Sequence, residues 1–444
     1  MPSAPLMAGN NSRAGIARAL RHRNYKLFFS GQSVSLMGTW ITRIATSWLV
    51  YRLTNSALLL GLVGFCGQIP TTLLAPFAGV LVDRVNRHRL LVWTQVLSAA
   101  QSAALAALAF TGTITVGWIL FLQVVQGIIN AFDTPTRQAF VVEMIEDRAD
   151  LPNAIALNST MVNGSRIIGP SIGGIIIAGF GEAWCFTVDA ISYLAVIASL
   201  LAMRVQPVDR RGDRATLFED LRDGYRYVSG FAPVRTVLLL LALVSSMGMP
   251  YTVLMPAMAS NVFHGGPHTL GFLMTASGAG AVVGALYLAS RRSVLGLGRV
   301  MVTATLAFGV ALVAFGASRS LLVALIILPV VGAGFMVETA STNTILQTVT
   351  EERLRGRVMA FYTLAFLGTA PLGSLLAGVV ADRIGAPATI VAGGVACIGG
   401  GLWLAFRLAE LRQLVRPIYI ERGILSAPGP SPAPAHTPDA GVAD

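Results

Sequence analysis

Apolar stretches of similar length follow one another along the 444-residue chain, separated by short segments that carry the charged residues. A transmembrane helix needs about 20 residues at about 1.5 Å each, so the intervals between charges indicate the number of spans. The interval 52–83 has room for one span. Two others, 89–133 and 235–291, are too long for a single crossing. Each contains turn residues near its middle, at 111–113 and 265–267, and therefore predicts two spans.

These three intervals hold five predicted helices, and the single span of the first lies at 58–82. Seven further apolar runs complete a set of twelve; they lie near residues 27–51, 153–180, 184–203, 300–318, 320–346, 358–381 and 384–406. The composition agrees, because 54% of the residues are hydrophobic and 12% are charged, at a mean hydropathy of +0.69. Soluble domains carry about 25% charged residues. We therefore expect an all-α, multi-pass protein of the cell membrane, with no soluble catalytic domain, no enzyme activity and no cofactor.

The net charge of +11 follows the predicted topology. Nearly all Lys and Arg fall on segments that alternating spans place on one side. Arg52, Arg319 and Arg383 lie on the other side, and Arg43 and Arg166 lie within helices. Because basic residues concentrate on the cytoplasmic side, this bias predicts cytoplasmic N- and C-termini. Contact with anionic lipid then explains the positive charge without a nucleic-acid partner.

A basic segment between the sixth and seventh spans divides the helices six and six. Within it Phe218, Leu221, Tyr225 and Val228 recur at helical steps, which indicates either an amphipathic helix on the inner leaflet or a simple tether. Cys66, Cys185 and Cys397 lie singly in apolar runs, so we expect no disulfide and no metal site. The predicted units are a cytoplasmic N-tail 1–25, a first bundle 26–204, a linker 205–234, a second bundle 235–408 and a cytoplasmic tail 409–444, disordered from about 423.

Two motifs resemble those of the major facilitator superfamily. Gly79, Asp83, Arg84 and Arg87 follow the second span, as in the loop motif of that superfamily, although Asn86 replaces its second glycine. The fifth span carries a glycine-proline sequence similar to that of the superfamily's antiporters, formed by Gly169, Pro170, Gly173 and Gly174. The stretches 131–140 and 355–378 are similar to the enterobactin-exporter and transmembrane-secretion-effector branch. The resemblance implies two six-helix bundles that move relative to one another.

The resemblance also implies a role for the loop motif as a latch on the cytoplasmic side. Asp83 would face the start of the eleventh helix near Gly356, and Arg84 or Arg87 would pair with Asp133. Such a latch supplies one state of a two-state element. The alternative is that the basic residues only orient the chain in the membrane.

Small residues indicate where helices approach closely. Gly169 and Gly173 on the fifth helix, like Gly280 and Gly284 on the eighth, are four residues apart and leave a smooth stripe for packing. The resemblance implies that these two helices meet between the bundles and seal against leak, and that Pro170 bends the fifth.

Polar stripes on two apolar helices predict a wet central cavity. Gln123, Gln126, Asn130 and Asp133 follow one face of the fourth helix, although the resembled family often has an arginine at the position of Gln123. The first helix has a similar polar face, formed by Thr39, Arg43, Thr46 and Ser47, with Trp40 beside it. An ordinary seam of interhelical hydrogen bonds is the competing interpretation.

Four charges inside the predicted membrane are candidate site residues. Arg43 and Asp189 lie at similar depths, so they form either a structural bridge or a substrate or proton site. Arg166 lies in the fifth helix. Glu338 is the only acid in the tenth helix and is the predicted coupling group; the alternative is a polar contact with a neighbouring helix.

These features predict a secondary active transporter that exports a small amphipathic compound, such as a drug or siderophore, by alternating access and proton antiport. The sequence GxxxxGK[ST] of nucleotide-binding loops is absent, so a proton gradient is the expected energy source. The expected partners are the substrate, protons and the lipid bilayer, and the expected state is a monomer. The alternatives are an uptake carrier or facilitator of the same fold, and a membrane receptor or assembly factor that transports nothing.

Overall fold

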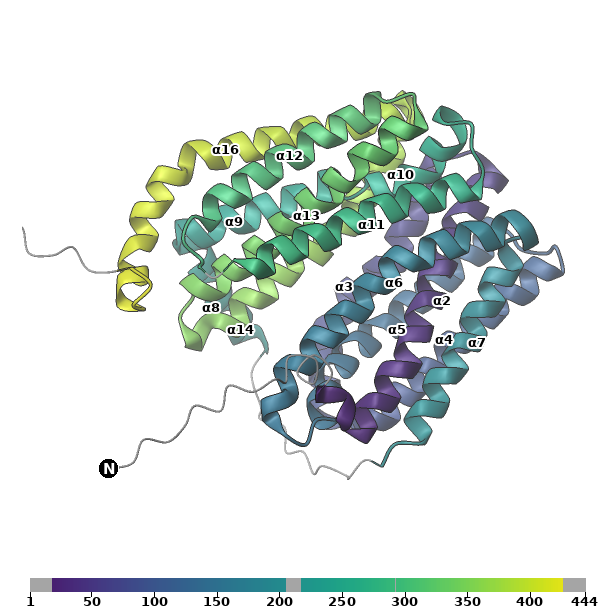
Figure 1. Ribbon diagram of the computed structural model, residues 1–444, viewed down its shortest axis with the longest axis horizontal. Helices are drawn as coiled ribbons and strands as arrows, with labels where there is room; N and C mark the ends of the chain where they lie inside the picture. The colour runs from purple at the N-terminus through teal and green to yellow at the C-terminus, as the bar shows by residue number, and fades with distance from the viewer. Residues whose placement is uncertain (1–17, 205–216, 292, 426–444) are drawn as a thin grey trace, which may run out of the picture.

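The computed structural model describes residues 18–204, 217–291 and 293–425, which are helices joined by short connections. Figure 1 shows two helix bundles side by side at an angle. The first bundle contains the 3₁₀ turns η1 (Arg18–Arg21) and η2 (Arg148–Asp150) and the helices α2 (Arg23–Thr54), α3 (Ala57–Arg84), α4 (Arg87–Phe110), α5 (Val116–Glu143), α6 (Leu151–Phe180) and α7 (Glu182–Leu201).

The second bundle has more interruptions within its helices, and a linker helix, α8 (Leu217–Gly230), precedes it. Its elements are α9 (Ala232–Leu243), η3 (Val244–Gly248), α10 (Tyr251–Ala257), η4 (Met258–Val262), α11 (Pro267–Ser290), α12 (Leu297–Ala317), α13 (Leu321–Val349), α14 (Glu352–Thr363), η5 (Leu364–Gly368), α15 (Thr369–Ile384) and α16 (Ala386–Glu421). The segments η3, η4 and η5 are π-helical turns. Pro250 lies two residues after the end of η3. It has no amide hydrogen, so it cannot donate the backbone hydrogen bond of a regular helix at this position.

Among the described residues, eleven helical stretches are long and apolar enough to cross a membrane. The run from α9 to η4 forms one of them, and the run from α14 to α15 forms another. The turns predicted at 111–113 and 265–267 are confirmed, because α4 ends at Phe110 and α11 begins at Pro267. α2 is not among the eleven, since its polar and basic residues lower its hydropathy.

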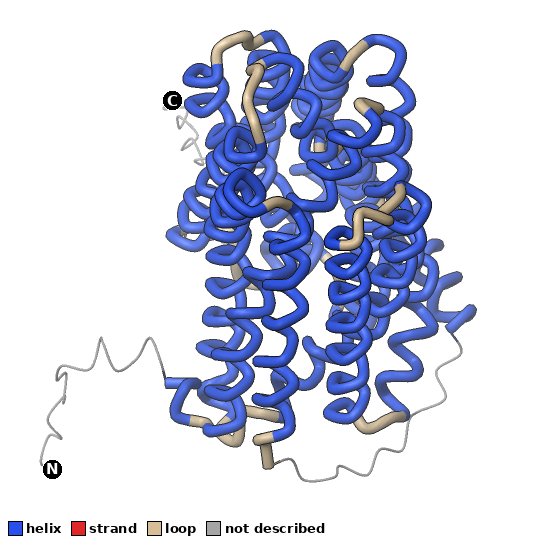
Figure 2. The backbone as a smooth tube through the Cα atoms, turned by 90° about the vertical axis from the view of Figure 1, so that its right-hand side faces the viewer, coloured by secondary structure: helices blue, strands red, loops and turns tan. Residues whose placement is uncertain are grey.

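Successive long helices run in opposite directions and so define two ends of the molecule. We call the end that carries η1, α8 and the end of α16 the terminal side, and the opposite end, with the turns after α2 and α6, the distal side (Figure 1). Figure 2 shows the long helices joined by short loops. The expected N-tail up to residue 17, the linker residues 205–216 and the tail from 426 fall outside the described residues.

The two bundles meet mainly through α3 with α15 and through α6 with α11. These contacts occupy the distal halves of the helices. Gly61 lies against Ser374 and Gly378, close enough that a Cβ there would lie 2.5 Å from the Ser374 carbonyl oxygen. On α3 the contacts reach Thr72, whose hydroxyl donates to the Leu367 carbonyl at 3.2 Å. Beyond that point Leu73 and Phe77 are exposed.

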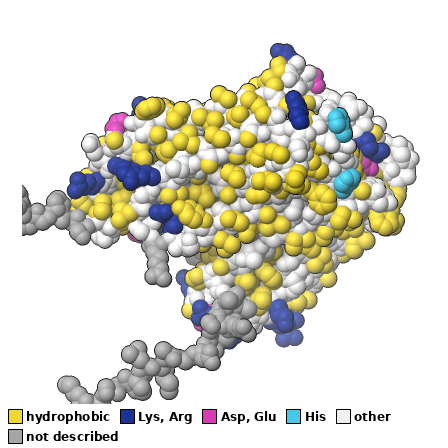
Figure 3. Space-filling model, turned by 45° about the horizontal axis from the view of Figure 1, so that its top comes forward, with side chains coloured by type: hydrophobic (Ala, Val, Ile, Leu, Met, Phe, Trp, Pro, Cys, Tyr) yellow, Lys and Arg dark blue, Asp and Glu magenta, His cyan; other side chains and the backbone are white. Residues whose placement is uncertain are grey.

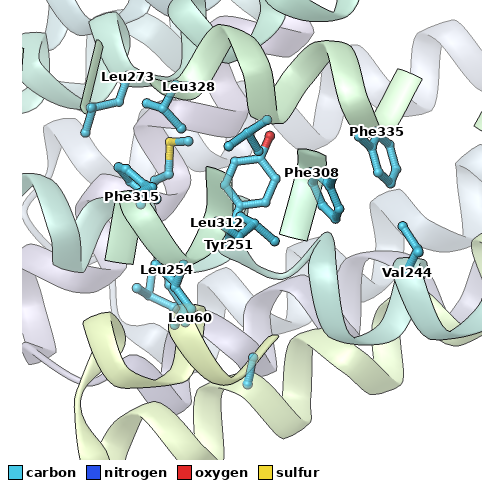
Figure 4. Packing of buried hydrophobic residues seen from close by; sticks show 14 of the residues in the cluster. Leu60, Val244, Tyr251, Leu254, Leu273, Phe308, Leu312, Phe315, Leu328 and Phe335 are labelled. Carbon is cyan, nitrogen blue, oxygen red and sulfur yellow. The ribbon is translucent and has the colours of Figure 1, made fainter. Parts of the chain in front are cut away.

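The main hydrophobic core joins the second bundle to the distal part of the first. Tyr251, Phe308 and Phe335 form a run of ring contacts inside the second bundle, with centroids 6.5 Å and 5.7 Å apart (Figure 4). Leu60 of α3 belongs to the same cluster. Figure 3 shows apolar side chains over much of one face, with Lys and Arg towards its edges, as expected for a surface in contact with lipid.

Candidate functional site

Asp133 lies deep within the first bundle and holds α4 to α5. Its carboxylate accepts hydrogen bonds from the Thr94 hydroxyl at 2.9 Å and the Gln95 amide at 2.7 Å, and lies 3.3 Å from Arg137 Nη2. The predicted pairing of Asp133 with Arg84 or Arg87 is therefore wrong. Arg87 instead pairs with Glu143 at 2.8 Å.

The physical reason for this difference is depth. Glu143 ends α5 beside the start of α4, whereas Asp133 lies ten residues earlier, about 15 Å further from the terminal side. Arg84 is exposed, and the side chain of Asp83 lies outside the described part of the structure.

The predicted contact between the loop motif and the start of α14 is not made at Gly356 in this conformation. A methyl group at Gly79 or at Gly356 would meet no atom within 4 Å. The start of α14 packs against the linker helix, where Arg357 pairs with Asp223 at 2.9 Å. The structure thus shows the two bundles apart at the terminal side, the state in which such a latch is open.

Helices α6 and α11 meet between the bundles, as the family resemblance implied, but through a different set of small residues. Gly174 packs on Gly271, and the hydroxyls of Ser171 and Thr275 are 2.7 Å apart. Thr275 also donates to the Ile167 carbonyl at 3.0 Å.

The glycines predicted for this contact mostly serve each bundle separately. Gly169 and Gly173 lie against Trp40 and Ile41 of α2, and Gly280 and Gly284 lie against α13. The reason is helical phase: nine residues separate Gly271 from Gly280, about two and a half turns, so the two face opposite sides of α11. Pro170 is buried, and a Cβ at Gly271 would lie 2.7 Å from its carbonyl oxygen.

The polar stripe of α5 forms part of a hydrogen-bonded seam. Gln126 donates to the Ser98 hydroxyl at 3.3 Å and to the Asn130 side-chain oxygen at 3.1 Å, and Gln123 lies near Gly67 of α3. All three stripe residues are half-buried. The hydrogen bond from Gln126 to Ser98 joins α5 to α4, whereas the one to Asn130 lies within α5.

Asp189 is 2% exposed and accepts a hydrogen bond from Ser102 of α4 at 2.8 Å. Among the described ion pairs, none joins Asp189 to Arg43, so the structure does not contain the proposed bridge. The Oδ2 atom of Asp189 accepts from the neutral Ser102 hydroxyl, and its Oδ1 lies beside Gly38 of α2. Neighbouring Tyr193 approaches Thr39 at 3.4 Å, which extends the polar contacts to α2.

Arg43 lies in the middle of α2 and is exposed, as is Thr39 one turn earlier, while Ser47 one turn later is half-buried. Helix α2 packs against α3, α5, α6, α7, α10 and α11, so helices rather than lipid surround it. The Arg43 guanidinium lies 5.1 Å from the ring centre of Trp40. Arg166 on α6 is half-buried, three residues before Gly169, which packs against Trp40. This face of α2 therefore borders an accessible space between helices.

Glu338 is fully buried, with 0% exposure, inside the second bundle. Its carboxylate accepts hydrogen bonds from Thr342 at 3.1 Å and Thr339 at 3.4 Å, and Thr342 also approaches Met301 of α12. It does not line an accessible space in this conformation. An isolated acid on an apolar helix does not indicate which face it occupies, and here the face packs against neighbouring helices.

A pocket that the sequence did not reveal lies at the terminal side of the second bundle. It has a volume of about 480 Å³ and is lined by Asn343, Thr344, Gln347, Thr348, Arg355, Arg422 and Ile424. Within residues 18–204, 217–291 and 293–425, no three His, Cys, Asp or Glu side chains come together as metal ligands.

Two helix bundles that meet at one end and separate at the other, with charged side chains between apolar helices, define a membrane transporter of the major facilitator type. Solved structures share this fold. A bacterial homologue of the human lysosomal transporter Spinster matches with a TM-score of 0.65 at 13% identity, covering 94% of this chain and 100% of that one. A peptide transporter of the POT family matches with a TM-score of 0.70 at 12% identity, covering 92% and 100%.

The chain belongs to the transmembrane secretion effector family, whose sequence profile matches residues 15–416. It is similar to the staphyloferrin A transporter of Staphylococcus aureus, at 27% identity over 84% of this chain and 93% of that protein. It is also similar to the multidrug efflux pump Tap of Mycolicibacterium fortuitum, at 28% identity over 85% and 93%, and to macrolide efflux protein A of Streptococcus pyogenes, at 23% over 82% and 92%. The protein is thus a multi-pass membrane transporter and not an enzyme.

Proposed function

We propose that the protein is a secondary active transporter that exports a small amphipathic compound by alternating access, in exchange for protons. The observation that carries this proposal is the uneven contact between the bundles. They are joined at the distal side by α3 with α15 and by α6 with α11, while Gly79 and Gly356 at the terminal side face open space. Alternating access requires a state that is open on one side only.

We infer that α2 is the twelfth spanning helix. Its 32 residues would extend about 48 Å, more than a bilayer's hydrocarbon core requires, and six other helices surround it. Its polar residues therefore need not contact lipid. Twelve spans place both termini on one side, and the excess of basic residues at the terminal side makes that side cytoplasmic. The structure would then be open to the cytoplasm, ready to accept a compound for export.

This topology is tested with single cysteines on opposite sides. Tyr225 on α8 and Arg319 before α13 are both exposed. In intact cells a membrane-impermeant maleimide should label Arg319→Cys but not Tyr225→Cys until the membrane is opened. Labelling of both variants from outside would contradict the assignment of sides.

For the exchange of protons, two buried carboxylates are the candidates. Asp189 in the first bundle and Glu338 in the second are both hydrogen-bonded to hydroxyl groups, and no described ion pair includes either. A carboxylate inside a membrane protein without a cationic partner is suited to take up and release a proton as its surroundings change. The family and the efflux proteins it resembles support export over uptake.

Everted membrane vesicles test direction and energy source together. A panel of labelled amphipaths should include erythromycin, ethidium and 2-naphthoate, so that different charges are represented. At least one should accumulate when the lumen is acidified, and a protonophore should abolish the accumulation. If none moves in vesicles that contain correctly inserted protein, proton-driven export is rejected, and uptake in right-side-out vesicles would support the carrier alternative.

A further inference from the structure

Two arginines lie on adjacent helices of the first bundle, on either side of one packing contact. Arg43 follows Trp40 of α2 by three residues, Arg166 precedes Gly169 of α6 by three, and Trp40 packs against Gly169. Within the described residues, neither forms an ion pair or a hydrogen bond with another side chain. Both retain contact with solvent, since Arg43 is exposed and Arg166 half-buried.

Three acids of the membrane region have surroundings of their own. Asp189 accepts from Ser102 of α4 and lies beside Gly38 of α2, Asp133 is paired with Arg137, and Glu338 is enclosed in the second bundle. Among the ion pairs of the described residues, none gives Arg43 or Arg166 a carboxylate partner. Like charges on adjacent helices repel each other, and an anion bound between them would relieve that repulsion.

The spacing of the two arginines is set by close packing between α2 and α6. Both helices run from the terminal to the distal side, and Gly173 lies against Ile41. Arg43 comes two residues after Ile41 and Arg166 seven before Gly173, so their backbones differ in level by about 13 Å. Long side chains on these positions can bind one extended anion from both ends, or two anionic groups of one molecule.

Other groups around the arginines suit the remainder of such a molecule. The Trp40 ring lies 5.1 Å from the Arg43 guanidinium and is itself half-buried, so it offers an aromatic surface beside the charge. The second bundle approaches Arg166 through α11, since a Cβ at Gly278 would lie 3.2 Å from the Arg166 carbonyl oxygen.

We propose that Arg43 and Arg166 form the recognition site for the substrate, and that the substrate is an amphipathic anion with one or more carboxylates. This inference rests on the proposed transport function and specifies its substrate class. A guanidinium binds a carboxylate through two parallel hydrogen bonds, which an ester cannot replace. A cationic amphipath would leave both arginines uncompensated and is rejected by the same charge.

Binding to the purified full-length protein tests the charge class apart from transport. The probes are 2-naphthoate, 2,6-naphthalenedicarboxylate and 4,4′-biphenyldicarboxylate, each paired with its neutral methyl ester. The carboxylates should raise the Tm in a concentration-dependent way, and the dicarboxylates should do so at lower concentration. The esters should have no effect. Equal stabilisation by acid and ester, or none by any carboxylate, overturns the proposal.

Variants assign the binding to the two arginines. Arg43→Gln and Arg166→Gln should each weaken apparent dicarboxylate affinity at least 10-fold, while Arg43→Lys restores part of it. Thr54→Ala, at the distal end of α2 where the hydroxyl donates to the Val50 carbonyl, is the matched control and should bind normally. Unchanged affinity in both glutamine variants would contradict the assignment.

A ligand-free measurement covers the case in which a glutamine variant does not fold. The fluorescence of Trp40 is obtained as the difference between the wild-type protein and Trp40→Phe. Iodide should quench this fluorescence more strongly than the neutral quencher acrylamide does. Weaker quenching by iodide than by acrylamide would argue against a cationic site. Export of the cation ethidium by the wild-type protein, with no transport of any carboxylate, would defeat this inference and leave the transport proposal intact. Carboxylate binding by a protein that transports none of the compounds would support this inference and reject the transport proposal.

Discussion

The carboxylate of Asp133 on α5 accepts a hydrogen bond from the side-chain amide of Gln95 on α4 at 2.7 Å. With Thr94 and Arg137 also in contact, this residue joins two helices inside the first bundle. At 5% exposure, the contact has little access to water. Asp133 is therefore expected to contribute to the stability of the bundle, although its place in the sequence had suggested a partner for the loop motif.

The first prediction concerns this contact. Asp133→Ala should destabilise the protein by about 3 kcal/mol, because removal of the buried carboxylate leaves the groups around it without their partner. The measurement is thermal unfolding of the purified protein. Asp133→Asn, which keeps an acceptor oxygen, should lose less; an unchanged Tm in Asp133→Ala would show that the contact is not stabilising.

The second prediction concerns the contact between α6 and α11. Cysteines replacing Ser171 and Thr275, whose hydroxyls are 2.7 Å apart, should form a disulfide under mild oxidation in a protein lacking Cys66, Cys185 and Cys397. The bond should hold the distal side closed and stop transport, and reduction should restore it. Full transport by the cross-linked protein would show that this contact does not open during the cycle.

The same background provides a comparison at the terminal side. Cysteines replacing Gly79 and Gly356, which face open space, should not cross-link in the conformation described. Cross-linking that appears only when substrate is transported would be evidence for closure at the loop motif.

The third prediction concerns Asp83. Asp83→Asn should leave insertion and folding largely intact but strongly reduce transport, because it removes a charge proposed to act only in the state closed at the terminal side. The measurement is export at matched expression. Asp382→Asn, in a similar sequence on the distal side, is the control and should transport normally. Normal export by Asp83→Asn would reject the latch role.

The fourth prediction concerns proton coupling. Glu338→Gln should abolish accumulation driven by an acidified lumen in everted vesicles, while downhill exchange of substrate continues, because the amide cannot carry a proton. Asp189→Asn is measured in parallel. The variant that loses coupling but keeps exchange identifies the coupling acid. A Glu338→Gln protein that still loads under the proton gradient removes Glu338 from the mechanism.

The sequence alone determined the features that depend on local composition. The turns at 111–113 and 265–267, the helical character of the chain and its place in the membrane follow from apolar length and turn residues, which act over a few residues. The family and its fold follow from motifs that are continuous in the chain, such as Gly169 to Gly174. These features need no knowledge of which helix packs against which.

Tertiary structure decided which face of each helix meets which neighbour. Gly280 and Gly271 lie on one helix, but only packing assigns the first to α13 and the second to α6. Glu338 becomes buried and Arg43 remains accessible because of the helices around them, although both are isolated charges in apolar sequence. The nearness of Arg43 to Arg166 arises across two helices, since side-chain contact depends on helical phase and register, which a single sequence does not encode locally.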